Sequence, residues 1–273
     1  MGYFYTMANL EIRRLAPDYS SAEGPHIPGE RMQIAEIRKP RGTGSRLHTH
    51  PNEQFSFVVE GRLRVRIGEE PEQEVGQGML LHVPAGVPHA FVAVSPGGAR
   101  YVTLKDMSWG MSGEALDRTT AGPHVDPEPP AASKDLRARS GNNPYISNLY
   151  ELEDIKIGPD YSTAHGGWVL GERIQVLLYN KAKGTGSRPH SHPNEQFIFV
   201  LTGKARAVVN GEEKIIGPGE VVHMPADSMH NVIALTGEDL VYLTAKDTTF
   251  GIHGIPGDGR NTGGFYEPGY KKD

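Results

Sequence analysis

Short apolar runs alternate with turn residues along most of the chain, and this pattern predicts strands rather than helices. The runs are rich in β-branched and aromatic residues and are four to seven residues long. Glycine and proline, with 34 and 21 copies, separate them and leave little room for long helices. The expected strands span residues 32–37, 54–60, 63–67, 79–83, 90–94, 101–104, 174–179, 196–201, 205–209, 221–224, 231–234 and 241–244.

The strand pattern occurs twice because the chain repeats itself. The segment HTHPNEQF begins at His48, and HSHPNEQF begins at His190, 142 residues later. The same offset relates PDYS at Pro17 to PDYS at Pro159 and GTGSR at Gly42 to GTGSR at Gly184. After a one-residue slip in a turn, an offset of 141 relates the later parts, including Lys105-Asp106 and Lys246-Asp247. One fold is therefore expected twice.

The repeat sets the expected domain boundaries. Residues 1–122 form the first domain and residues 144–253 the second, and both are expected to be all-β sandwiches or closed barrels. Residues 123–143 are rich in proline, alanine and charge without apolar periodicity, which predicts a linker. Residues 254–273 are dense in glycine and proline, which predicts an irregular tail.

Composition removes several function classes. Acidic and basic side chains number 33 and 28, for a net charge of −5 without long blocks of one sign, so neither a nucleic-acid nor a membrane partner is expected. The chain has no cysteine, which excludes disulfides and thiolate metal sites. No apolar stretch suggests a signal peptide or a membrane span, so we expect a cytoplasmic protein, with Met7 as an alternative natural start.

Histidines of each repeat have the spacing of a metal site. On a strand, His48 and His50 project from the same face, close enough to bind one ion. Gln54 follows in phase, and His89 opens a later strand that a jelly-roll topology lays beside the first. The second repeat has His190, His192, Gln196 and His230 in the same pattern. Two solvent-facing histidines are the alternative for each pair alone, but the complete duplicate favours metal ligands.

At these residues the sequence resembles the cupin superfamily. Gly42, the two histidines, Gln54 and Gly61 fit the first cupin motif, and Gly78, Pro84, Gly86 and His89 fit the second. The later repeat matches both motifs too, with Asp227 where glycine is usual. The resemblance implies two tandem jelly-roll barrels, each with three histidines and a fourth ligand. Glutamine stands in the family's carboxylate position, so Gln54 and Gln196 are the expected fourth ligands.

A neutral fourth ligand changes the expected chemistry. Glutamine leaves the full 2+ charge of a bound ion uncompensated, so each site should attract an anion and stabilise a developing enolate or alkoxide. Imidazole and amide ligands suit iron, nickel, manganese, zinc or copper, and the metal stays open. We expect one such divalent ion in each domain.

Candidate catalytic groups are fewer. Arg46 and Arg188 precede each histidine pair by two residues and are candidate anchors for a substrate carboxylate, although a surface ion pair is the commoner role. Glu53 and Glu195 are candidate general bases, together with a metal-bound water, but period-two geometry turns them to the opposite strand face. His82 and His223 lie outside the motifs and are expected to be structural.

Three functions stay open at this point. The leading hypothesis is a metal-dependent isomerase or lyase that acts on a small organic acid or another polar metabolite. The resemblance also implies an iron- or nickel-dependent dioxygenase that cleaves an aromatic or enolic substrate. A non-catalytic ligand-binding cupin is the third, and the survival of both ligand sets argues against it. A homodimer and internal pairing of the two barrels are both compatible with the sequence.

Overall fold

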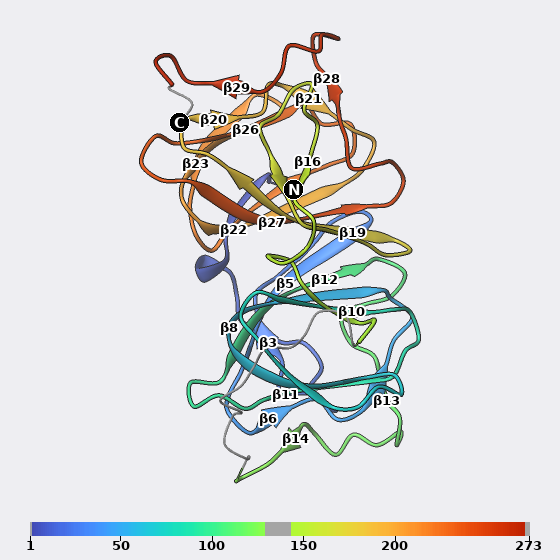
Figure 1. Cartoon of the computed structure of the whole chain (residues 1–273). Helices are drawn as coiled ribbons and strands as arrows, with labels where there is room; N and C mark the ends of the chain where they lie inside the picture. The colour runs from blue at the N-terminus through green and yellow to red at the C-terminus, as the bar shows by residue number, and fades with distance from the viewer. Residues whose placement is uncertain (1, 129–142, 271–273) are drawn as a thin grey trace. The chain divides into compact units, whose positions relative to one another are not determined.

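A computed structural model describes residues 2–128 and 143–270 of the chain, and it is built almost entirely of β-strands (Figure 1). One 3-10 helix, η1 (Met7–Asn9), is the only helical element in those ranges. No helix there is long and apolar enough to cross a membrane. The expected all-β fold is confirmed.

The chain forms two compact units whose boundaries differ from the expected ones. One unit contains residues 10–148, and the other combines residues 1–9 with residues 149–273. The first nine residues therefore group with the second repeat rather than with the domain that follows them directly. Most of the expected linker, residues 129–142, lies outside the described residues.

The unit of the first repeat has one long strand that takes part in both layers of its barrel. This strand, β8, pairs with β10 and β12 through its first half and with β9 and β11 through its second half. The sequence predicts two strands here, separated at Gly61, whereas the structure has one continuous strand. Gly61 bends it with a φ of 75°. The strands of this unit are β2 (Arg13–Arg14), β3 (Glu23–Gly24), β4 (His26–Pro28), β5 (Met32–Lys39), β6 (Thr43–Gly44), β7 (His48–Thr49), β8 (Gln54–Ile67), β9 (Gln73–Gly76), β10 (Met79–Val83), β11 (His89–Ala93), β12 (Ala99–Asp106), β13 (Glu114–Ala115), β14 (His124–Val125) and β15 (Ile146–Asn148).

The unit of the second repeat forms the same barrel from two separate sheets. One sheet has the order β1, β25, β22, β27, β19, β17, β16, and the other has β24, β23, β26, β20, β29. Asn210-Gly211 joins β23 to β24 with positive φ at both residues, as the turn sequence requires. The strands are β1 (Phe4–Thr6), β16 (Ile155–Lys156), β17 (His165–Gly166), β18 (Trp168–Leu170), β19 (Ile174–Lys181), β20 (Thr185–Gly186), β21 (His190–Ser191), β22 (Gln196–Thr202), β23 (Ala205–Val209), β24 (Glu212–Ile216), β25 (Glu220–Met224), β26 (His230–Ala234), β27 (Leu240–Asp247), β28 (Ile255–Pro256) and β29 (Phe265–Tyr266).

The first strand of each repeat belongs to the barrel of the other repeat. Strand β1 pairs with β25, with Tyr5 opposite Val221. The equivalent strand β15 pairs with β10, with Ser147 opposite Leu80. The two pairings have the same antiparallel register at the repeat offsets, so the exchange is reciprocal. The sequence does not predict this exchange, because an edge strand with alternating side chains can pair with any exposed sheet edge that matches it.

Each barrel is followed by an extended segment that lies along the strands carrying the histidines. We call residues 107–126 the first strap and residues 248–267 the second strap. In the first, β13 pairs with β7 and β14 with β6, and in the second, β28 pairs with β21 and β29 with β20. Residues 254–267, expected to be irregular, thus contain two short paired strands.

The interior of each barrel separates into an apolar part and a polar part. Aliphatic and aromatic side chains from both layers form a large buried cluster in each unit. The histidines of the repeated motif are buried beside this cluster, each no more than 8% exposed. Polar groups buried this deeply need hydrogen-bond or charged partners.

Candidate metal centres

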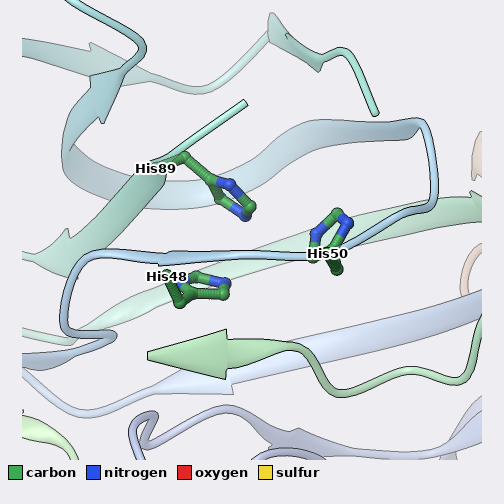
Figure 2. A group of neighbouring side chains, drawn as sticks. All are labelled: His48, His50 and His89. Atoms are coloured by element: carbon green, nitrogen blue, oxygen red, sulfur yellow. The ribbon is translucent and has the colours of Figure 1, made fainter. Parts of the chain in front are cut away.

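Three imidazoles meet inside the first barrel. His48 on β7 is the direct cross-strand partner of His89 on β11, and His50 follows at the end of β7. One nitrogen of each ring lies within 4.8 Å of those of the other two. Figure 2 shows the three rings gathered around a common space, from two chain segments that the sequence separates by about forty residues. The expected convergence of these histidines is present in the structure.

Backbone carbonyls fix the orientation of all three rings. The Nδ1 atom of His48 donates to the carbonyl of Arg46 at 2.9 Å, and those of His50 and His89 donate to Asn52 and Val87 at 3.0 Å. A carbonyl only accepts, so each Nδ1 carries the proton and each Nε2 keeps its lone pair. Outer hydrogen bonds of this type orient metal-binding histidines in many proteins.

The inner nitrogens have the state that a cation needs. Burial lowers the pKa of His48 and His89 well below the usual value, and it lowers that of His50 to about 4, with Lys105 adding to the effect. The rings are therefore neutral near pH 7 and available as ligands. His89 Nε2 is buried and has no hydrogen-bond partner among the described residues. A buried orphan nitrogen is costly, and a divalent ion would satisfy it.

The second barrel repeats this geometry. His190 pairs with His230 across β21 and β26, with ring centroids 4.3 Å apart, and His192 lies 4.8 Å from His230. The Nδ1 atoms of the three rings donate to the carbonyls of Arg188, Asn194 and Ser228. His230 Nε2 is again buried, with no hydrogen-bond partner in the part of the chain that the structure describes. Both repeats hence present the same three inner nitrogens.

The two glutamines face these nitrogens through their oxygen atoms. Gln54 Oε1 lies 3.2 Å from His50 Nε2, and Gln196 Oε1 lies 2.8 Å from His192 Nε2. The amide nitrogens point away and donate to Ser56 Oγ at 3.0 Å and Thr244 Oγ1 at 2.7 Å. With Nδ1 protonated, an oxygen lone pair faces a nitrogen lone pair, which is unfavourable unless a cation binds both. The donor set therefore fits a metal ion.

The two candidate glutamates bind a different pair of histidines. Glu53 Oε1 accepts a hydrogen bond from His82 Nε2 at 2.7 Å, and Glu195 Oε1 accepts one from His223 Nε2 at 2.7 Å. Both carboxylates are buried on the strand face opposite the glutamines, as period-two alternation requires. They are placed to hold His82 and His223 rather than to act on a ligand at the imidazoles.

The two candidate arginines also lie elsewhere. Arg46 donates to the carbonyls of Asp18, Thr119 and Gly122 and pairs with Asp117, so its guanidinium fastens the first strap. Arg188 Nε donates to the carbonyl of Gly263 in the second strap. Contrary to expectation, Arg46 does not lie on the same strand face as the histidines. The chain bends at Leu47, between β6 and β7, and this bend interrupts the alternation of side chains.

A small cavity adjoins each set of histidines. The cavity of the first barrel has a volume of about 50 Å³ and that of the second about 20 Å³. His48, His89 and Gln54 line the first, and His190, His230 and Gln196 line the second. Each also receives the side chains of buried residues that sequence reasoning did not select: Tyr19, Lys39 and Lys105 in the first, and Tyr161, Lys181 and Lys246 in the second.

The two tyrosines pack directly on a metal-site histidine. Tyr19 lies 4.4 Å from His48 between ring centroids, and Tyr161 lies 4.2 Å from His190. Burial raises the pKa of both phenols to about 12. Their hydroxyls accept hydrogen bonds from the backbone of Gly113 and Gly254 in the straps, at 2.6 Å. The PDYS segment, repeated at Pro17 and Pro159, is the sequence signal that marks both tyrosines.

Comparisons with known proteins agree with this geometry. The cupin domain family matches twice, over residues 36–105 and 178–246. Oxalate decarboxylase of Bacillus subtilis is 23% identical over 78% of this chain, and the match spans 66% of that enzyme. Quercetin 2,3-dioxygenase of the same bacterium is 21% identical over 74% of the chain and 69% of its own length. The pectin degradation protein KdgF of Dickeya dadantii is 29% identical over 23% of the chain and 57% of its own.

Solved structures show the same fold. A structure of oxalate decarboxylase superposes with a TM-score of 0.69 at 19% identity, covering 89% of this chain and 76% of the other. A structure of the Bacillus subtilis enzyme from a study of its Mn(II) centres superposes with a TM-score of 0.68 at 18% identity, with the same coverage of both chains. At this identity the likeness describes the fold rather than the reaction.

Proposed function

Because the chain belongs to the cupin family, with two cupin domains, we propose that it is a metal-dependent enzyme of the isomerase or lyase type. Its substrate on this proposal is a small organic acid. His48, His50, His89 and Gln54 would hold the ion in the first barrel, and His190, His192, His230 and Gln196 in the second. The supporting observation is the inward-facing set of buried, neutral nitrogen and oxygen donors in both repeats. A divalent ion there would supply a Lewis acid that polarises a carbonyl or enol oxygen.

The chain's own residues favour an anionic, small substrate. The donors are all uncharged, so they do not neutralise a bound cation, and an anion is attracted to the site. Drug-sized ligands need cavities of roughly 300 Å³ or more. The two cavities, about 50 and 20 Å³, suit a molecule of a few heavy atoms. The hydroxyls of Tyr19 and Tyr161 accept from the straps and keep their own protons available to a ligand in the cavity.

A dioxygenase stays the second candidate because quercetin 2,3-dioxygenase is among the relatives. Three histidines with open coordination positions also suit that chemistry. The cavity volumes argue against a flavonol-sized substrate and leave small enolic acids. Oxygen uptake during turnover separates the two candidates, since isomerisation and elimination consume none.

The metal itself is part of the proposal. Iron, nickel, manganese, zinc and copper all accept this donor set, and the Mn(II) centres of the structural relative make manganese the first to test. A cytoplasmic location and a homodimer remain predictions.

Elemental analysis followed by chelation tests the proposed function. Purified protein should contain close to two equivalents of one divalent metal per chain, and His48→Ala and His190→Ala should each remove one. His165→Ala, at a half-buried histidine of the second unit that pairs with Asp154, is the matched control and should keep both. Turnover in a screen of small organic acids, oxalate included, should vanish on chelation and return with the metal. Full turnover by metal-free protein would reject the proposal.

A further inference from the structure

Each barrel encloses two deeply buried lysine side chains. Lys39 and Lys105 in the first unit and Lys181 and Lys246 in the second are each no more than 4% exposed. Among the described residues, none of the four forms an ion pair. Buried charges are normally paired, so four such lysines need an explanation.

The hydrogen bonds of these lysines use only part of their donor capacity. Lys39 Nζ donates to the carbonyl of Phe91 at 2.9 Å, and Lys105 Nζ donates to that of Met111 at 2.8 Å. The second unit has the equivalent bonds, from Lys181 to Val232 at 2.9 Å and from Lys246 to Ile252 at 3.0 Å, and Lys181 Nζ also donates to Ser187 Oγ at 3.5 Å. An ammonium has three N–H groups, and one carbonyl accepts only one of them. Donors therefore remain for a ligand.

One lysine of each pair lies beside the metal ligands. Lys105 on β12 is the cross-strand partner of Gln54 on β8, and Lys246 is the partner of Gln196. Directly opposed residues of neighbouring strands place their side chains on the same face, about 5 Å apart at Cβ. Lys105 hence enters the cavity at its histidine end.

The other lysine enters the same cavity from the opposite end. Strands β5 and β12 are antiparallel, with Lys39 opposite Ala99 and Lys105 opposite Gln33. Lys39 thus starts at the far end of the ladder, and its Nζ reaches the carbonyl of Phe91, two residues beyond His89 on β11. Lys39 and Lys105 both line the cavity of the first barrel. Lys181 and Lys246 do so in the second.

Among the described residues, no acidic side chain lines either cavity, and the lysines are the only charged groups that do. Histidine, glutamine, serine, threonine and tyrosine provide the other polar groups. Burial lowers the pKa of all four lysines to about 7, and the charges of Asp106 and Asp247 offset this only in part at Lys105 and Lys246. An anion in the cavity would compensate the positive charge of a lysine. An anion with a negative charge at each end would compensate both lysines at once.

We propose that each cavity binds a short organic dianion, with one carboxylate at Lys105 or Lys246 beside the metal ligands and the other at Lys39 or Lys181. The site at the histidine end rests on the proposed function, whereas the lysine at the far end is independent of any metal. The small volumes restrict the ligand to a short dicarboxylate. A purely structural role, in which neutral lysines only bridge to backbone carbonyls, predicts no such preference.

Calorimetric titration with succinate and butyrate tests the proposal, because the two acids have the same chain length and differ in one carboxylate. The manganese-loaded protein should bind succinate at least tenfold more tightly than butyrate. In the Lys39→Met/Lys181→Met double variant, succinate affinity should fall to the butyrate level while metal content stays unchanged. Lys183→Met, at an exposed lysine of the second unit, is the matched control and should behave as the unmodified protein.

Two outcomes overturn the proposal: equal affinity for the two acids in the unmodified protein, or undiminished succinate binding in the double variant. If the methionine variant does not fold, Lys39→Gln/Lys181→Gln keeps a donor for the carbonyls of Phe91 and Val232 without the charge, and the same comparison applies. Turnover that survives chelation would reject the proposed function but not lysine-dependent succinate binding. Metal-dependent turnover without a dianion preference would reject this inference alone.

Discussion

Single residues set the orientation of both candidate metal centres. Each imidazole donates from Nδ1 to a carbonyl two residues away in the chain, so the local backbone determines where Nε2 points. The two repeats place different residues at one position of the turn that precedes the third histidine. Gly86 has a φ of 75°, and Asp227 takes its place in the second repeat with a φ of 60°. The left-handed conformation costs an aspartate more than a glycine.

We therefore expect Asp227→Gly to stabilise the protein. Removing Cβ at a left-handed position should raise the free energy of unfolding by about 1 kcal/mol. The reciprocal change, Gly86→Asp, should lower it by a similar amount, since a Cβ at Gly86 meets open space and only the backbone conformation is strained. Urea titrations of both variants, monitored by circular dichroism, measure the effect. A loss of stability in Asp227→Gly would show that its side chain contributes more than its backbone costs.

At this scale the sequence predicted the histidines and glutamines but not the residues around them. Spacing on a strand was sufficient for His48 and His50, because alternation is a local property. Arg46 was misplaced because a bend at Leu47 interrupts that alternation. The local sequence does not show whether a strand residue faces the barrel interior, so it does not identify the lysines or Tyr19 as site residues. Their segments, Lys105-Asp106 and PDYS, nevertheless occur in both repeats.

Among the elements, the two straps act most directly on the sites. Gly254 in the second strap lies so close to the histidines that a Cβ there would come within 2.8 Å of His190 Cδ2 and 2.9 Å of the Tyr161 hydroxyl. Real Cβ atoms essentially never approach this closely, so either the strap or the imidazole would have to move. The strap therefore limits where His190 can lie.

Gly254→Ala should consequently weaken metal binding in the second barrel alone. We expect metal content to fall from about two to about one equivalent per chain, with the first site unaffected. Gly251→Ala is the matched control, because a Cβ at Gly251 meets nothing within 4 Å. Elemental analysis after dialysis checks the result, and full occupancy in Gly254→Ala would mean that the strap yields without disturbing the imidazole.

Strand positions followed from the sequence more closely than strand partners did. Strands β10 and β23 have the expected bounds, and most others are longer by one to three residues at an end. The straps and β1 were not expected as strands, because edge strands of two or three residues carry too little apolar periodicity to be recognised. Their pairing depends on the surface already formed by the barrels.

For the whole molecule, the buried lysines should make stability depend on pH. Burial lowers the pKa of Lys39 and Lys181 from 10.5 to about 7, and the neighbouring ring of Tyr101 or Tyr242 offers no opposing charge. Between pH 7 and 10.5 the unfolded chain then binds more protons than the folded one. Under this condition the free energy of unfolding rises with pH.

Metal-free protein should thus become more stable between pH 7 and pH 9.5, by at least about 1 kcal/mol, as one unit of pKa difference corresponds to roughly 1.4 kcal/mol. The Lys39→Met/Lys181→Met variant should show a smaller rise, and Lys183→Met should show the full one. Urea unfolding at several pH values provides the measurement. A profile that is flat, or that falls, in the unmodified protein would contradict the lowered pKa values.

The reciprocal pairing of β1 with β25 and of β15 with β10 has a consequence for the history of the gene. Fission of the coding sequence between the repeats would yield two products, each carrying a strand that completes the other and lacking one of its own. Neither product could evolve independently without first replacing that strand. The two halves are therefore expected to stay joined in one chain, since each supplies a strand of the other half's barrel.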